Sequence, residues 1–167
     1  MSVYIWSDLH FYHDKIRLYE NRPFESVEKM NQILCKNWKE TVKGQDTIIN
    51  LGDVSLNLNK EQISKILFNL PGYKILIMGN HDKGKSVSWW MDVGFNEVYK
   101  YPIIYDSFYI LSHEPLYINA NMPYVNIHGH THSEKSNNPQ KINVSVEVLE
   151  YKPILFEEIK KIYAISE

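Results

Sequence analysis

Histidine, aspartate and asparagine side chains recur directly behind short apolar runs along this chain. The stretch YVNIHGHTH at residues 124–132 places three histidines within five positions. Runs that end in the same way precede Asp8 and His10, Asp53, Asn80, and His113. Neutral imidazoles, carboxylates and amide oxygens are ligands of divalent metal ions. This recurrence therefore predicts a metal site built from the ends of several strands.

The candidate ligands are too numerous for one ion of ordinary coordination. Two divalent ions that share one carboxylate would use them all, and two aspartates would balance only half of the positive charge. Such a centre attracts phosphate groups and activates water for attack on phosphorus. The predicted ligands are Asp8, His10, Asp53, Asn80, His113, His130 and His132.

The segments between the apolar runs predict the sheet that would bring these side chains together. Residues 27–42 have helical spacing after an N-cap at Ser26, and Asn59 can cap a second helix that ends before Pro71. A weaker helix is expected over residues 86–93. Strands that alternate with helices indicate a parallel sheet with right-handed crossovers. The carboxyl ends of its strands share one edge, where ligands bind.

Beyond residue 96 the pattern changes to short runs separated by turns, which predicts hairpins, and the tail predicts two or three strands and a closing helix. We therefore expect an α/β fold with a mixed, mostly parallel sheet and a second sheet. The length favours a single domain over residues 1–167. Residues 8 and 10, like 130 and 132, are expected to project to the same side of an extended chain.

The motifs that carry these residues resemble those of the calcineurin-like metallophosphoesterase superfamily, and SDLHFYHDKI resembles its small bacterial and phage members. The resemblance implies an α/β/β/α sandwich with the metal site at the carboxyl ends of mixed sheets. The matching motifs are Asp8-Leu9-His10, Gly52-Asp53, Gly79-Asn80-His81-Asp82, His113 and Gly129-His130-Thr131-His132.

The same resemblance assigns a role to each matching residue. One ion would take Asp8, His10 and His132, the other would take Asn80, His113 and His130, and Asp53 would bridge both. His81 would face the substrate as a general acid or a hydrogen-bond donor, with Asp82 orienting it and Asn80 also near the substrate.

The family pattern assigns no role to two other histidines and a basic segment. Tyr12 stands where a glycine is usual, which could displace His13, and a substrate-binding role for His13 is one hypothesis. His128 is expected to be a core or supporting imidazole, with substrate contact as the alternative. Lys15, Arg17 and Arg22 are expected to form a solvated face.

These observations predict a hydrolase that cleaves a small phosphodiester or phosphomonoester, with nucleotides and cyclic nucleotides as candidates, by attack of a metal-bridging hydroxide. Manganese is the expected metal, and iron, zinc and nickel are alternatives. A nuclease and a catalytically silent binding scaffold of the same fold are the competing hypotheses. The net charge of -2 argues against extended nucleic-acid binding. No apolar run could span a membrane, so we expect a cytoplasmic protein, with homo-oligomerisation left open.

Overall fold

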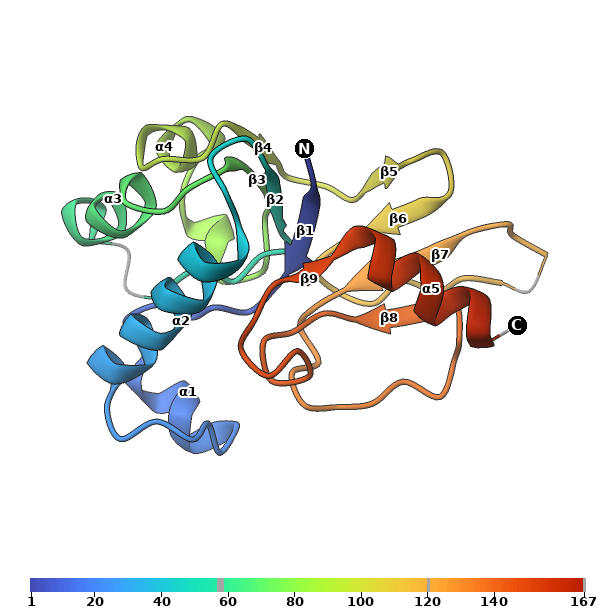
Figure 1. The fold of residues 1–167 in the computed structure, drawn as a ribbon, viewed down its shortest axis with the longest axis horizontal. Helices are drawn as coiled ribbons and strands as arrows, with labels where there is room; N and C mark the ends of the chain where they lie inside the picture. Colours follow the sequence, from blue (N-terminus) through green and yellow to red (C-terminus); the bar gives the residue numbers. More distant parts are fainter. Residues whose placement is uncertain (57–58, 120, 167) are drawn as a thin grey trace.

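The computed structural model describes residues 1–56, 59–119 and 121–166, and within this range two β-sheets have helices packed around them (Figure 1). The first sheet has the strand order β4-β3-β2-β1-β9. Strands β1 to β4 are parallel, whereas β9 runs antiparallel to β1. The strands are β1 (Val3–Trp6), β2 (Thr47–Asn50), β3 (Tyr73–Ile77), β4 (Glu97–Tyr99) and β9 (Ile154–Leu155).

The second sheet has the order β5-β6-β7-β8. Strands β5 and β6 form an antiparallel hairpin, and the pairs β6-β7 and β7-β8 are parallel. Both sheets are therefore mixed, and the expected α/β fold class is confirmed. The strands are β5 (Ile103–Tyr105), β6 (Tyr109–Leu111), β7 (Val125–His128) and β8 (Lys141–Asn143).

Helices form the crossovers of the first sheet and the end of the described chain (Figure 1). Two helices connect β1 to β2, one connects β2 to β3, and a short 3-10 turn with a helix connects β3 to β4. In chain order the helical elements are α1 (Asp14–Tyr19), α2 (Val27–Thr41), α3 (Lys60–Phe68), η1 (Asp82–Gly84), α4 (Val87–Asp92) and α5 (Phe156–Ser166).

Capping side chains explain where the predicted helices begin. Ser26 Oγ accepts a hydrogen bond from Lys29 N at 3.1 Å, and Asn59 Oδ1 accepts one from Gln62 N at 3.0 Å. The helices predicted over residues 27–42, after Asn59 and over 86–93 are confirmed to within about two residues. Helix α1 was not predicted, because a helix this short carries too little periodic pattern.

The alternation of side chains along the central strands divides the core in two. Trp6 of β1 faces the helices, where its ring lies 5.3 Å from that of Trp38. Ile5 faces the opposite side and joins Ile127 in the cluster between the sheets, to which α5 contributes Phe156. Because the central strands are buried on both faces, the loops at their carboxyl ends start from fixed positions.

The expectation of hairpins beyond residue 96 is confirmed for β5 and β6 and is wrong for β4. Strand β4 pairs in parallel with β3, with Ile75 opposite Glu97 and Ile77 opposite Tyr99. A three-residue edge strand and one arm of a hairpin have the same side-chain period, so the sequence pattern does not distinguish them. Among the described residues, no helix combines the length and the apolar character needed to cross a bilayer.

Candidate metal centre

The predicted ligands come from five separate loops and gather at the carboxyl ends of β1, β2, β3, β6 and β7. The sequence predicted that residues 8 and 10, like 130 and 132, project to the same side because the chain is extended. The chain is not extended at these residues, so that reason is wrong. Five of the ligands have left-handed backbone angles that L-residues adopt only when the surroundings impose them. Their φ values are 63° for Asp8, 52° for His10, 54° for Asp53, 68° for His130 and 48° for His132.

The glycines beside these residues allow the loops to approach one another closely. A Cβ atom on Gly129 would overlap Ser7 Oγ and the Asp8 carboxylate, and one on Gly79 would overlap Asp53 Oδ1. A side chain at position 79 or 129 would push two ligand loops apart. This explains why a glycine stands directly before Asn80 and before His130.

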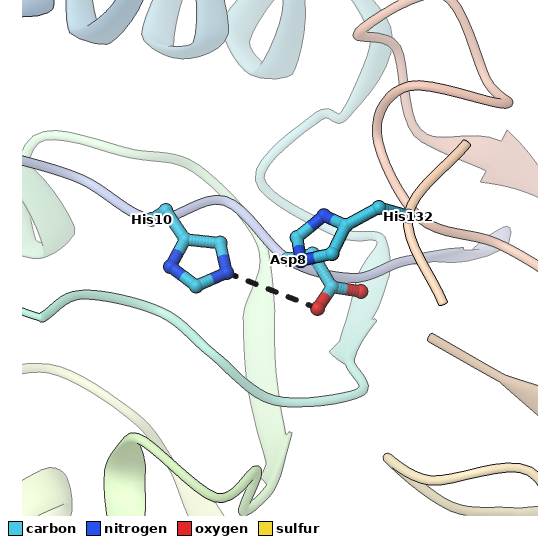
Figure 2. Close-up of side chains that lie close together, drawn as sticks. All are labelled: Asp8, His10 and His132. Atoms are coloured by element: carbon cyan, nitrogen blue, oxygen red, sulfur yellow. Dashed lines mark ion pairs between the residues drawn. The ribbon is translucent and has the colours of Figure 1, made fainter. Parts of the chain in front are cut away.

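Asp8, His10 and His132 form one group of candidate ligands, whose ligand atoms lie within 4.8 Å of one another. Figure 2 shows the rings of His10 and His132 beside the Asp8 carboxylate. His10 Nε2 lies 4.0 Å from Asp8 Oδ1, which is too far for a hydrogen bond. Asp8 Oδ2 is already engaged, because it accepts hydrogen bonds from His130 N at 2.9 Å and Ser145 Oγ at 3.0 Å.

Asn80, His113 and His130 meet at a second point. His113 Nε2 lies 2.9 Å from Asn80 Oδ1 and 3.1 Å from His130 Nδ1. Asp53 Oδ1 lies 3.5 Å from the same His113 nitrogen. An amide oxygen, a carboxylate oxygen and two ring nitrogens are thus directed at one small volume.

Asp53 lies between the two groups. Its Oδ1 faces His113, and its Oδ2 lies 3.6 Å from His10 Nε2. Burial opposes ionisation of Asp53, but the hydrogen bond and charge of His113, with the charge of His10, hold its pKa at about 2. The carboxylate is therefore ionised at neutral pH and has one oxygen for each group.

Two of the atoms that would face a metal ion in the first group lack a protein partner. Among the described residues, Asp8 Oδ1 and His10 Nε2 are buried without a hydrogen-bond partner, a costly arrangement unless a cation binds there. Oxygen and imidazole donors suit manganese, iron, zinc or nickel. The residues present therefore fit divalent ions at both groups.

Hydrogen bonds on the far side of the rings hold them in this orientation. His113 Nδ1 donates to Leu51 O at 2.8 Å, which leaves Nε2 directed at the centre. His132 Nδ1 lies 3.0 Å from Glu147 Oε1, and His10 Nδ1 lies 3.2 Å from His13 Nδ1. Partners of this kind select the tautomer of a metal-binding histidine and fix its ring.

Arg22 and Glu147 contact the candidate ligands from behind, which the sequence did not predict. The Arg22 side chain is fully buried and pairs with Glu147 Oε1 at 2.7 Å. It also donates to the backbone oxygens of Asp8 at 2.7 Å and Leu9 at 3.1 Å. The expectation that Arg22 belongs to a solvated face is wrong, because its guanidinium joins the first ligand loop to the glutamate that holds His132.

The structure also corrects the contact predicted for Asp82. Its carboxylate accepts hydrogen bonds from the backbone nitrogens of Asp53 and Gly79 at 2.8 Å and of Val54 at 3.1 Å. Burial, together with the charge of Asp53, raises the pKa of Asp82 to about 7. Asp82 therefore holds the two loops together and does not contact the His81 ring.

Three more histidines lie around the centre. His81 donates its backbone N–H to Asp53 Oδ1 at 3.0 Å, and its Nε2 lies 3.7 Å from Asp53 Oδ2. His81 and His13 are partly exposed, with ring centroids 6.3 Å apart. His128 is buried in β7 and donates Nδ1–H to Gly129 O at 2.8 Å.

The protonation of His113 leads to a prediction about metal binding. Burial alone would lower its pKa, but the hydrogen bond that the ring donates to Asp53 and the charge of Asp8 raise it to about 9. The metal-free protein thus carries a proton on His113 at pH 7, and a metal ion must displace it. We expect Mn²⁺ binding to release about one proton and its affinity to rise up to about tenfold per pH unit below pH 9.

Calorimetric titration in two buffers of different ionisation enthalpy measures that release. Equal heats in both buffers at pH 7 would contradict the prediction.

Comparisons with known proteins agree with this geometry. Residues 1–164 match the family model described as calcineurin-like phosphoesterase. The chain is 38% identical over 172 residues to the uncharacterized protein MJ1445 of Methanocaldococcus jannaschii, covering 96% of this chain and 90% of that protein. It is 36% identical over 83 residues to the Gene 66 protein of Mycobacterium phage L5, covering 48% of this chain and 40% of the phage protein.

A solved structure is similar over almost the whole length. The protein of unknown function AQ665 from Aquifex aeolicus superposes with a TM-score of 0.75 at 28% sequence identity, covering 96% of this chain and 98% of that one. Sequence and fold thus point to the same group of proteins.

Proposed function

Since the chain belongs to the calcineurin-like phosphoesterase family, we propose that it hydrolyses small phosphodiesters or phosphomonoesters at a centre of two divalent ions. The position of Asp53 carries this proposal, because its two carboxylate oxygens face two separate groups of nitrogen and oxygen donors. Residues 1–167 would form one catalytic domain. Manganese is the metal that we propose first, with iron, zinc or nickel as alternatives.

The chain's own residues would hold the ions in two sets that share Asp53. Asp8, His10 and His132 would bind one ion, and Asn80, His113 and His130 would bind the other. Divalent ions in such a site supply an acidified water and positive charge for the phosphate oxygens. The buried hydrogen bonds behind the rings keep the ligands in place without further ordering when the ions bind.

His81 is positioned to act on the substrate. Its backbone N–H is bonded to Asp53, which fixes the loop, while its ring remains partly exposed beside the centre. We propose that the ring donates a proton to the oxygen of the leaving group.

His13 would help to bind the substrate, because its contact with His10 determines which ring nitrogen carries the proton. If His10 binds an ion through Nε2, its Nδ1–H donates to His13 Nδ1 at 3.2 Å. His13 then carries its proton on Nε2, where it can donate to a phosphoryl oxygen.

The hydrolysis of bis-p-nitrophenyl phosphate and of p-nitrophenyl phosphate with Mn²⁺ tests the proposal. Turnover of either supports a phosphoesterase, and the ratio of the two rates ranks diesters against monoesters. Absence of turnover of both at full metal occupancy would favour a binding scaffold.

Replacing His81 with alanine is expected to lower kcat by about a hundredfold for a diester with a strongly basic alkoxide leaving group. The loss should be smaller for p-nitrophenolate, which leaves readily without a proton. Metal content, measured by atomic emission, should remain unchanged. An equal loss with both leaving groups would exclude proton donation, and loss of an ion would instead make His81 a ligand.

A further inference from the structure

The ligand-bearing edge of the first sheet continues beyond the metal centre. Strands β1, β2 and β3 lead into Asp8, Asp53 and Asn80, and β4 lies parallel to β3. The next residues after β4 are Lys100 and Tyr101. Because the carboxyl ends of parallel strands share one edge, these two residues lie on the side of the centre where β3 ends.

A pocket of about 210 Å³ lies at this end of the edge. Three lysines line it and no carboxylate does, so its lining carries only positive charge. The pocket is smaller than the roughly 300–1,000 Å³ of a complete small-molecule site. It therefore suits one part of a ligand whose remainder lies elsewhere. The lining residues are Met78, Lys83, Lys85, Lys100 and Tyr101.

Two segments connect this pocket to the centre. Met78 directly precedes the Gly79-Asn80 loop, and its N–H donates to Tyr99 O at 2.9 Å, which ties the end of β3 to the end of β4. Lys83 follows His81 by two residues, in η1. A substrate held beside His81 would thus have the pocket as its neighbour.

The lysines are only partly neutralised. Lys83 pairs with Glu114 at 3.3 Å, but both side chains are about half exposed, so the pair is weak. Lys85 Nζ lies 5.3 Å from the centroid of the Trp89 ring. For Lys100 the described residues provide no carboxylate partner. Grouped ammonium groups whose charge is only partly balanced favour a phosphate ligand.

Tyr101 adds an aromatic surface to this charge. It is 76% exposed, which is unusual for a large ring that borders a pocket. Exposed aromatic rings beside basic side chains are the combination on which nucleobases stack while their phosphates are neutralised.

We propose that this pocket is a subsite for a nucleotide portion of the substrate, with a second phosphate on the lysines and the base against Tyr101. This inference rests on the proposed function, since the phosphoester to be cleaved would lie at the metal centre. It makes phosphorylated nucleoside diesters the preferred substrate class. A free nucleotide and the end of a nucleic-acid strand would both present this base and this second phosphate.

Three chromogenic esters with the same leaving group test the subsite. They are bis-p-nitrophenyl phosphate, the p-nitrophenyl ester of thymidine 5′-phosphate, and the same ester with a second phosphate at the 3′ position. We expect kcat/KM to rise along this series, and Lys100→Gln to remove most of the gain from the second phosphate. Tyr101→Ala should remove about a tenfold gain from the nucleoside. Lys161→Gln, an exposed lysine of α5, is the matched control and should change neither ratio.

The outcomes separate the subsite from the chemistry. Equal kcat/KM for the three esters, with bis-p-nitrophenyl phosphate still hydrolysed, would overturn the subsite and leave the proposed function standing. If no ester is hydrolysed, the subsite is tested by the binding of thymidine 3′,5′-bisphosphate to the metal-free protein. Weaker binding by Lys100→Gln than by wild type would support the subsite, and equal affinity would overturn it. Competition by a single-stranded oligonucleotide much stronger than that by the bisphosphate would identify a strand end as the source.

Discussion

Replacing Asp53 with asparagine is expected to remove at least one metal ion and to lower kcat for bis-p-nitrophenyl phosphate by about a thousandfold or more. The carboxylate is buried and faces His10 with one oxygen and His113 with the other. Its pKa of about 2 means that the wild-type group is charged at every pH where the enzyme would be assayed. Asparagine keeps the shape but removes the charge and one of the two oxygen donors.

Metal content and turnover are to be measured on the same protein samples. Asp106→Asn is the matched control, since Asp106 is an exposed carboxylate that pairs with Lys160 at 2.8 Å, outside the candidate metal groups. The control should keep both ions and full activity. An Asp53→Asn protein that retained two ions and its kcat would show that Asp53 does not bridge them.

Replacing Arg22 with methionine is expected to lower the free energy of unfolding by about 3–5 kcal/mol. The reason is the buried charge that it would leave behind. Glu147 pairs with Arg22 at 2.7 Å, and the Arg22 and Glu147 side chains are only 0% and 5% exposed. The variant would also leave the backbone oxygens of Asp8 and Leu9 without their buried donor.

Urea denaturation of the metal-free protein measures this loss without a contribution from metal binding. Lys60→Met is the control, because Lys60 and Asp92 form an exposed pair at 3.0 Å that contributes less than about 1 kcal/mol. Adding Glu147→Gln to Arg22→Met should recover part of the stability, since it removes the buried charge that has lost its arginine partner. A loss no larger than that of Lys60→Met would rule out a stabilising role for the pair.

Local pattern was sufficient to identify most elements and the candidate ligands. The caps at Ser26 and Asn59 lie within four residues of the groups that they satisfy, so short stretches of sequence specify where those helices begin. The polar residues behind apolar runs could likewise be identified from order along the chain, because parallel strands bring their carboxyl ends to one edge.

Contacts between residues far apart in the chain could not be predicted from local sequence pattern. Arg22 and Glu147 are separated by 125 positions, and neither belongs to a pattern that names the other as its partner. The family resemblance implied that Asp82 orients His81, yet its carboxylate turns toward Val54 and Gly79. The parallel pairing of β4 and the pocket at Lys100 likewise depend on how the whole chain is arranged.

Sequence pattern alone identified the side chains that could bind metal, the α/β class, and the longer helices between the strands, though not α1. Only the packed chain fixes the orientation of the ligands, the partners behind them, and the set of lysines that line the pocket after β4. The physical reason is the distance along the chain over which each interaction acts. Helix caps and side-chain periods act over a few residues, whereas a buried ion pair or the close approach of two loops at a glycine exists only after distant segments have packed together.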